Sequence, residues 1–441
     1  MNLLIPIHCY SVVITILTFP NTFILLRGEK AKMIYKKKLK FILILFVPFT
    51  LLLTTCKSDV PVEPQITPAR GQIVSFTNGG SFTAPLLQVM IGSISGGEQI
   101  KNKVIYDVDY YKLMYRTVDS KGNVIIVSGA LFLPKGKSNL PIISVQHGTQ
   151  TKRTNVGSVN ALNAPEGLIA AALGYFALAP DYIGLGESTQ THPYHIAKSS
   201  ADPVIDIIRA GKVFASKNNI TLNGQIFLAG YSEGGYVTMA AQREIEFNYK
   251  SEFNLTAVAP MAGAYDLNMT AKKILQSQTY NKPAYLAYFL VAYNEIYRWN
   301  NLNAFFNSPY VEKLPSLFNG NYTVDEIDAQ LTNDLTKLIN QNFVKSYLAG
   351  TETTLTTAFA TNSLLNWRPI APMRLYHGNA DEYVPYENSV QAKNYFLTQG
   401  ISVELVTISG GKHVSSALPS IFAAIEWFGT LKLGKRYLTK K

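Results

Sequence analysis

One short stretch, Gly230-Tyr231-Ser232-Glu233-Gly234, constrains the fold of this chain more than any other. It follows Gln225 to Ala229, an apolar run typical of a buried strand, and precedes Gly235 to Arg243, which is rich in helix-forming residues. A serine between two glycines at such a junction predicts a sharp strand-to-helix turn that points the serine outward, because side chains at the glycines would collide with neighbouring backbone. Flexible Gly/Ser turns share this pattern, so its meaning depends on the rest of the chain.

Short apolar runs alternate with helical segments from residue 140 onward. Near-continuous hydrophobic strands between helices predict the α/β class, with a mostly parallel central sheet covered by helices on both faces. The expected strands are Pro141 to Val145, Tyr175 to Ala179, Gln225 to Ala229, Ala257 to Ala259, Met373 to Tyr376 and Ser402 to Ile408.

Helices are expected at Ala164 to Leu173, Pro203 to Ser216 and Ala417 to Leu431. The second of them opens with Asp202 as N-cap and Pro203 at the first helical position. Earlier in the chain, β-branched and aromatic residues at 104–115 and 124–133 predict an antiparallel hairpin.

The segment 267–366 interrupts the alternation and is expected to be a helical cap inserted before the strand at 373. Thr323 to Glu326 form a capping box ahead of apolar residues at helical spacing, Ile327, Leu331, Leu335 and Leu338. A second helix is expected after Pro283, with aromatic side chains at i, i+4 spacing, namely Tyr285, Phe289, Tyr293 and Tyr297. This stripe is typical either of packing between helices or of the wall of an apolar substrate channel.

A nucleophilic serine needs a base, and the chain has six histidines. His413 is the candidate, because it follows the last expected strand in the loop Ser409 to His413, where a base belongs if nucleophile, acid and base occur in that order. The acid is expected on the loop after the strand at 373, and Asp381 is preferred there. Asp266 is a competitor, because it follows the preceding strand and a carboxylate on that loop can reach the same histidine.

A tetrahedral oxyanion needs two N–H donors. One is expected from Glu233, the residue after the serine, and the other from the loop Gln146-His147-Gly148-Thr149. Thr149 is the preferred second donor and Gly148 the alternative.

The formal net charge of +11 does not indicate a nucleic-acid partner. Residues 1–57 hold eight Lys and Arg and one Glu, a net of +7, so the remainder carries only +4. The charge belongs instead to a targeting segment. Lys36 to Lys40 precede the apolar run Phe41 to Leu53 and then Thr54-Thr55-Cys56, which is the order of a secretory signal. Thirteen residues interrupted by Pro48 are too few to span a bilayer.

The domain boundaries follow from these patterns. Residues 1–56 form an N-terminal extension and signal, in which Met33 is a cleaner start than Met1, and 57–72 form a Pro-containing tether. The α/β core is expected at 73–266 and 367–435, with the cap at 267–366. Cys9 and Cys56 are the only cysteines, so neither disulfides nor thiol ligands are expected after processing.

Several of these motifs together resemble the α/β-hydrolase superfamily and, within it, the secretory lipase and esterase group. The matching stretches are His147-Gly148-Thr149, Ala179 to Gly186, His192-Pro193-Tyr194, Gly230 to Gly235, His377-Gly378 with Asp381, and His413. The resemblance implies an α/β-hydrolase fold, a catalytic set of Ser232, Asp381 and His413, hydrolysis of a carboxylic ester, and no cofactor. The apolar, aromatic residues of the segment 267–366 favour an ester with an apolar acyl or aryl group over a charged substrate. The resemblance also implies that Asp181, His192 and His195 belong to a structural loop, and as a metal pair His192 and His195 lack accompanying thiols or carboxylates.

The N-terminal signal resembles that of a bacterial lipoprotein, which implies lipid attachment at Cys56 and a membrane-anchored protein of the cell envelope. Leu53 to Cys56 departs from the commonest form, which has Gly or Ala just before the cysteine. Three other functions stay open: an exopeptidase, for which Asp325, Glu326, Asp328 and Asp334 could supply acidic groups, a carbohydrate acetyl or feruloyl esterase, and a non-catalytic binding lipoprotein.

Overall fold

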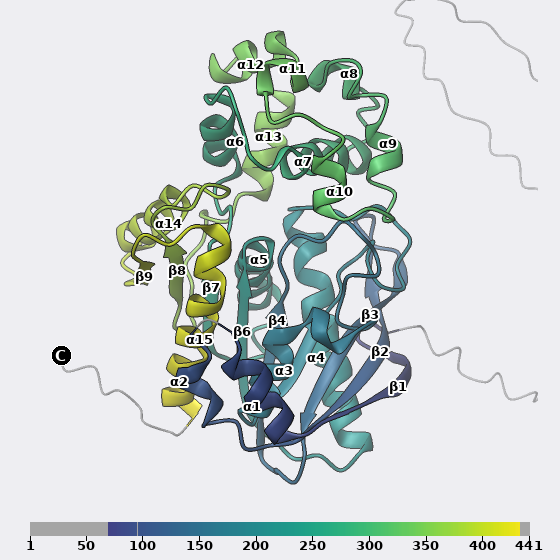
Figure 1. The fold of residues 1–441 in the computed structure, drawn as a ribbon, viewed down its shortest axis with the longest axis vertical. Coiled ribbons are helices and arrows are strands. Elements are labelled where there is room, and N and C mark those ends of the chain that lie inside the picture. The colour runs from purple at the N-terminus through teal and green to yellow at the C-terminus, as the bar shows by residue number, and fades with distance from the viewer. Residues whose placement is uncertain (1–68, 95, 433–441) are drawn as a thin grey trace, which may run out of the picture. The chain divides into compact units, whose positions relative to one another are not determined.

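The computed structural model describes residues 69–94 and 96–432. The expected signal, Cys56 and residues 57–68 of the tether lie outside these ranges. One nine-stranded sheet runs through the described part of the chain in the order β1-β2-β3-β5-β4-β6-β7-β8-β9 (Figure 1). The first three strands pair antiparallel, β3 also meets β5 antiparallel, and from β5 to β9 all pairs are parallel.

The expected hairpin and parallel strands are all present. They are β2 (Val108–Val118), β3 (Val124–Pro134), β4 (Leu140–Gln146), β5 (Phe176–Pro180), β6 (Leu222–Tyr231), β7 (Leu255–Met261), β8 (Arg374–Gly378) and β9 (Glu404–Ile408). Only β1 (Ile73–Phe82) was not expected as a strand. It is an edge strand that is exposed along almost its whole length, so it lacks the continuous buried apolar run that marks the central strands.

Helices cover both faces of the sheet, as predicted. α3 (Pro165–Ala172), α15 (His413–Lys432) and α1 (Ala84–Gly92) pack on one face, and α4 (Ala197–Lys217), α5 (Glu233–Asn248) and α14 (Glu387–Thr398) on the other. Alternate residues of β4 serve the two cores, with Ile142 in one and Ile143 in the other. The short helix α2 (Glu98–Lys101) adds Ile100 to the core that contains Ile143.

The expected start of α4 was wrong. The helix begins at Ala197, so Asp202 is not its N-cap and Pro203 lies inside it. The reason is tertiary, because the side-chain oxygen of Asn362, from the cap, accepts the N–H of Ala197 at 2.9 Å and satisfies the helix start.

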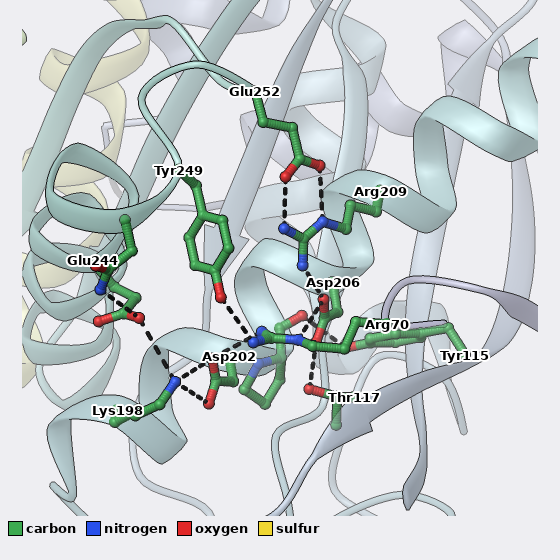
Figure 2. A network of polar contacts seen from close by, with 12 residues as sticks. Arg70, Tyr115, Thr117, Lys198, Asp202, Asp206, Arg209, Glu244, Tyr249 and Glu252 are labelled. Carbon is green, nitrogen blue, oxygen red and sulfur yellow. Dashed lines mark hydrogen bonds and ion pairs between the residues drawn. The ribbon is translucent and has the colours of Figure 1, made fainter. Parts of the chain in front are cut away.

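Asp202 belongs instead to a network of charges on α4 (Figure 2). The Arg70 guanidinium lies 2.7 Å from Asp202 and 3.0 Å from Asp206, and Arg209 lies 2.7 Å from Asp206. Thr117 of β2 also donates to Asp206. Arg70 falls within the segment 57–72 predicted as a tether, so the last residues of that segment are packed against the core.

Eight helices lie between β7 and β8, within the segment expected to be the cap (Figure 1). The capping box of Thr323 and Glu326 is confirmed, but the helix after it is short and a second one begins after Asp334. The helices are α6 (Leu267–Leu275), α7 (Pro283–Ile296), α8 (Leu302–Phe305), α9 (Leu314–Leu317), α10 (Val324–Asp328), α11 (Leu335–Leu338), α12 (Gln341–Leu348) and α13 (Thr354–Asn362).

Candidate active site

Ser232 occupies a strained turn between β6 and α5. Its φ of 61° is positive, a conformation that non-glycine residues rarely adopt. A Cβ on Gly230 would lie 2.4 Å from the Gly234 carbonyl oxygen, and one on Gly234 would lie 2.0 Å from that of Gln146. The two flanking glycines are therefore required by close backbone approach, as the sequence predicts.

Three side chains from distant parts of the chain meet at this turn. Nε2 of His413 lies 2.8 Å from Oγ of Ser232, and its Nδ1 lies 2.6 Å from Oδ2 of Asp381. All three are buried or nearly so. Asp381 follows β8, and His413 is the first residue of α15, where the sequence predicted a loop ahead of the helix. The structure thus brings together the three residues proposed from sequence.

The other oxygen of Asp381 accepts the backbone N–H groups of Tyr383 at 2.9 Å and Val384 at 2.8 Å. Burial raises the pKa of Asp381, but hydrogen bonds from His377 and His413 outweigh it and hold the pKa well below the usual range. Asp381 is therefore ionised at neutral pH and oriented by hydrogen bonds at both oxygens.

His377 was missed as part of this site, because a His-Gly pair at a strand end has no separate signal in the sequence. It is fully buried, and its Nε2 lies 3.1 Å from Oδ2 of Asp381 and 3.1 Å from the carbonyl oxygen of Val384. Both are acceptors, so Nε2 carries the proton, and Nδ1 accepts the Ser389 hydroxyl at 2.8 Å. Asp381 is thus held by two histidines.

Asp266, the competitor for the acid, is not brought to His413. Its carboxylate caps α6 by accepting the Met269 N–H at 3.0 Å. Glu382, next to Asp381, accepts the backbone N–H of His413 at 3.1 Å and so stabilises the start of α15.

The two loops expected to supply oxyanion donors also meet here. Glu233 is the first residue of α5, so the helix contains no carbonyl oxygen that could accept its backbone N–H. A Cβ built on Gly148 would lie 3.8 Å from Cβ of Ser232, which places the 147–149 loop beside Ser232.

His147 orients that loop. Its Nδ1 lies 2.7 Å from the Gly148 carbonyl oxygen, and its ring stacks on Tyr182 at 4.1 Å between centroids. In a trans peptide the C=O and N–H groups point in opposite directions. Because the Gly148 carbonyl points toward His147, the N–H of Thr149 in the same peptide points away from the His147 ring. The choice of Thr149 over Gly148 as the second donor stays a prediction.

His192 and His195 lie in the loop beside the nucleophile, but they do not form a metal site with other ligands in the described ranges. Nε2 of His192 forms a hydrogen bond of 2.7 Å with Oε1 of Glu233. His195 is buried among Tyr194, Tyr236 and Phe289, and burial lowers its pKa well below the usual value. Asp181 accepts from Ser128 and Ser158 and so has the structural role implied by the resemblance.

The aromatic stripe of α7 packs against this loop and also borders a pocket. Tyr293 donates its hydroxyl to the His195 carbonyl, and the Phe289 ring lies 4.4 Å from that of His195. The other face of Phe289 borders an apolar pocket inside the cap. Its walls are Leu267, Thr270, Ala271, Ile274, Leu275, Leu286, Phe289, Leu290, Phe343, Leu355 and Phe359. Packing of the stripe is thus confirmed for Tyr293 and Phe289, and a substrate channel stays a prediction.

A serine on the turn after a central parallel strand, hydrogen-bonded to a histidine that is in turn hydrogen-bonded to an aspartate, defines an α/β-hydrolase. The chain belongs to the secretory lipase family, whose sequence profile matches residues 160–438. It is accordingly a carboxylic ester hydrolase.

Several known proteins are similar to it. Lipase 9 of Candida albicans is 22% identical over 393 residues, which cover 83% of this chain and 82% of that lipase. The rice cell wall degrading esterase LipA from Xanthomonas oryzae has a TM-score of 0.75 at 26% identity, covering 84% of this chain and 100% of that one. Candida antarctica lipase A shares the fold, with a TM-score of 0.64 at 13% identity and 83% of each chain covered.

Proposed function

We propose that this ester hydrolase works through an acyl-enzyme formed on Ser232. The observation that carries the proposal is the hydrogen-bonded chain from Ser232 through His413 to Asp381. Because Nδ1 of His413 faces an ionised carboxylate, that nitrogen carries the proton and the Nε2 lone pair faces the serine hydroxyl.

Ser232 attacks the acyl carbon while His413 accepts its proton, and His413 then donates that proton to the alcohol leaving group. Water releases the acid by the same route. The N–H groups of Glu233 and Thr149 stabilise the oxyanion of both tetrahedral intermediates.

We propose that the substrate is an ester with an apolar acyl or aryl group, and that the apolar pocket in the cap receives this group. This pocket has almost no polar surface and about 20 Å³ of free space, room for only one water molecule. An acyl chain therefore requires the cap helices to move apart, a motion common to enzymes with lids.

A peptidase that captures a terminal amine fits the cap less well. Asp325 and Asp328 both pair with Lys282, at 2.7 Å and 3.1 Å. Glu326 and Asp334 cap their own helices. The four carboxylates that such an enzyme could use are thus already occupied by groups of the chain itself.

A carbohydrate esterase is the second candidate. The observation that favours it is the similarity to LipA, described as a cell wall degrading esterase, over 84% of this chain.

The test is hydrolysis of p-nitrophenyl esters of increasing acyl length, beside acetylated xylan and aminoacyl nitroanilides. We expect ester hydrolysis to depend on acyl length, and Ser232→Ala to lower kcat by about 10⁴-fold or more. Ester hydrolysis that persists in Ser232→Ala would rule out the acyl-enzyme. Activity on acetylated xylan alone would instead indicate a carbohydrate esterase, and activity on anilides alone would indicate a peptidase.

The protein is further proposed to be a lipoprotein of the bacterial cell envelope, held in the membrane by lipid on Cys56. The support is the basic, apolar and cysteine-terminated order of residues 36–56. Its neutral ester substrate is the expected partner, and nucleic acid is not.

A further inference from the structure

The residue after the nucleophile carries a buried carboxyl group that the reaction does not use. Oε1 of Glu233 lies 2.7 Å from Nε2 of His192, and the two side chains are 1% and 5% exposed. The backbone N–H of the same Glu233 is the proposed oxyanion donor. A side-chain carboxyl lies within about 5 Å of its own backbone nitrogen, given standard bond lengths. This acid therefore sits close to where negative charge develops during the reaction.

The hydrogen bonds of His192 define the charge of the pair. Its Nδ1 lies 2.7 Å from the carbonyl oxygen of Ile183, which can only accept, so Nδ1 carries a proton. The contact between Nε2 and Oε1 then holds one further proton, on either atom. The pair is either imidazolium with carboxylate or imidazole with carboxylic acid, and its net charge is zero in both cases.

The surroundings offer little else to balance a charge on Glu233. Its Oε2 is buried and has no hydrogen-bond partner within the described ranges. The rings of Tyr182, Tyr194 and Tyr288 surround His192 at 5.5 to 6.0 Å between centroids and separate the pair from water. The other acidic, basic and histidine side chains around this aromatic cluster are Arg153, Glu166, Asp181, His147 and His195. Arg153 donates to the backbone oxygens of Ser188 and Asn319.

We propose that His192 is a positioning residue that acts through Glu233: it keeps the carboxyl beside the oxyanion hole neutral as a pair and its backbone N–H in place. This inference rests on the acyl-enzyme proposed above. Without His192, Glu233 in its ionised form would place an unpaired carboxylate about 6 Å from the oxyanion, which at an effective dielectric constant of about 20 would slow the reaction by about 100-fold.

A double-mutant cycle on the full-length protein tests this. His192→Phe keeps an aromatic ring among the tyrosines but cannot hold a proton, and Glu233→Gln removes the charge. We expect His192→Phe to lower kcat on p-nitrophenyl butyrate by about 100-fold in the wild-type background, with KM within about threefold. In the Glu233→Gln background the same change should lower kcat by less than about fivefold.

Equal losses in both backgrounds would show that His192 acts through packing alone and would overturn the proposal. No loss in either background would overturn it as well. Circular dichroism and Tm establish that each variant is folded. If His192→Phe does not fold, His192→Gln replaces it with the same expectation, because its amide cannot hold the additional proton.

Ser232→Ala is measured in parallel. Failure of the acyl-enzyme mechanism appears as activity that survives Ser232→Ala. Failure of the present proposal appears as equal losses, or none, in the two backgrounds while Ser232→Ala is inactive.

Discussion

At the scale of single residues, the site depends on hydrogen-bond donors that converge on Asp381. Two backbone N–H groups bond one carboxylate oxygen, and His413 and His377 bond the other. The His413 contact was predictable from the order of motifs along the chain. The His377 contact was not, because only the turn after β8 brings residues 377 and 381 face to face. A carboxylate held in this way keeps both its charge and its orientation toward the base.

His377→Leu should lower kcat by about tenfold, because the loss of one hydrogen bond to a carboxylate costs about 1.5 kcal/mol. His377→Gln should lose less, since its amide can still donate to Asp381. The measurement is kcat and KM on one p-nitrophenyl ester, with Tm to check folding. If the two variants lose the same activity, donation by His377 to Asp381 has no part in the reaction.

At the scale of elements, most strands were predictable because those of a parallel sheet are buried on both faces and are continuously apolar. The starts of the helices were less predictable from the sequence. α4 begins six residues before the expected Pro203, and its start is capped by Asn362 from α13. Two acids of α4, Asp202 and Asp206, are buried. They form ion pairs with Lys198, Arg70 and Arg209. Burial raises the pKa of Asp206 above its usual value even with Arg70 beside it, so its ionisation depends on those partners.

Arg70→Met should therefore lower the free energy of unfolding by about 2–4 kcal/mol, because it leaves two buried carboxylates with fewer partners. Lys103→Met is the matched control. Its ion pair with Glu426 is exposed, at 57% and 49%, and its loss should cost less than about 1 kcal/mol. Urea unfolding of both variants gives the comparison. Equal, small losses would show that Arg70 does not stabilise α4.

At the scale of the whole molecule, the chain combines an α/β core, the helices inserted between β7 and β8, and the N-terminal segment proposed to anchor it. The described part of the chain starts just before Arg70, which ties the first residues of the core to α4. The anchor proposal rests on a sequence with two cysteines, Cys9 and Cys56, which provides its own control.

Cys56→Ala should abolish incorporation of labelled fatty acid and release the protein from the membrane fraction, whereas Cys9→Ala should change neither. The expected reason is that lipid on Cys56 supplies the apolar contact with the bilayer. Intact-mass analysis and fractionation check both variants. Fatty-acid labelling that persists in Cys56→Ala would contradict the proposal.

The sequence by itself determined the α/β class, the turn at Ser232 and the choice of Ser232 and His413 as candidates, because these depend on local rules: periodicity of apolar residues, glycines at close approaches, and residues at the ends of strands. Only the tertiary structure decided between Asp381 and Asp266, added His377 to the acid, and joined His192 to Glu233. The contacts of Asp381 with His413 and of His192 with Glu233 connect residues 32 and 41 positions apart, so tertiary packing and not local chain geometry brings them together. The contact of His377 with Asp381 spans only four residues, but it depends on the conformation of the turn after β8. The same tertiary packing connects Ser232, on its strained turn, through His413 to Asp381 by hydrogen bonds.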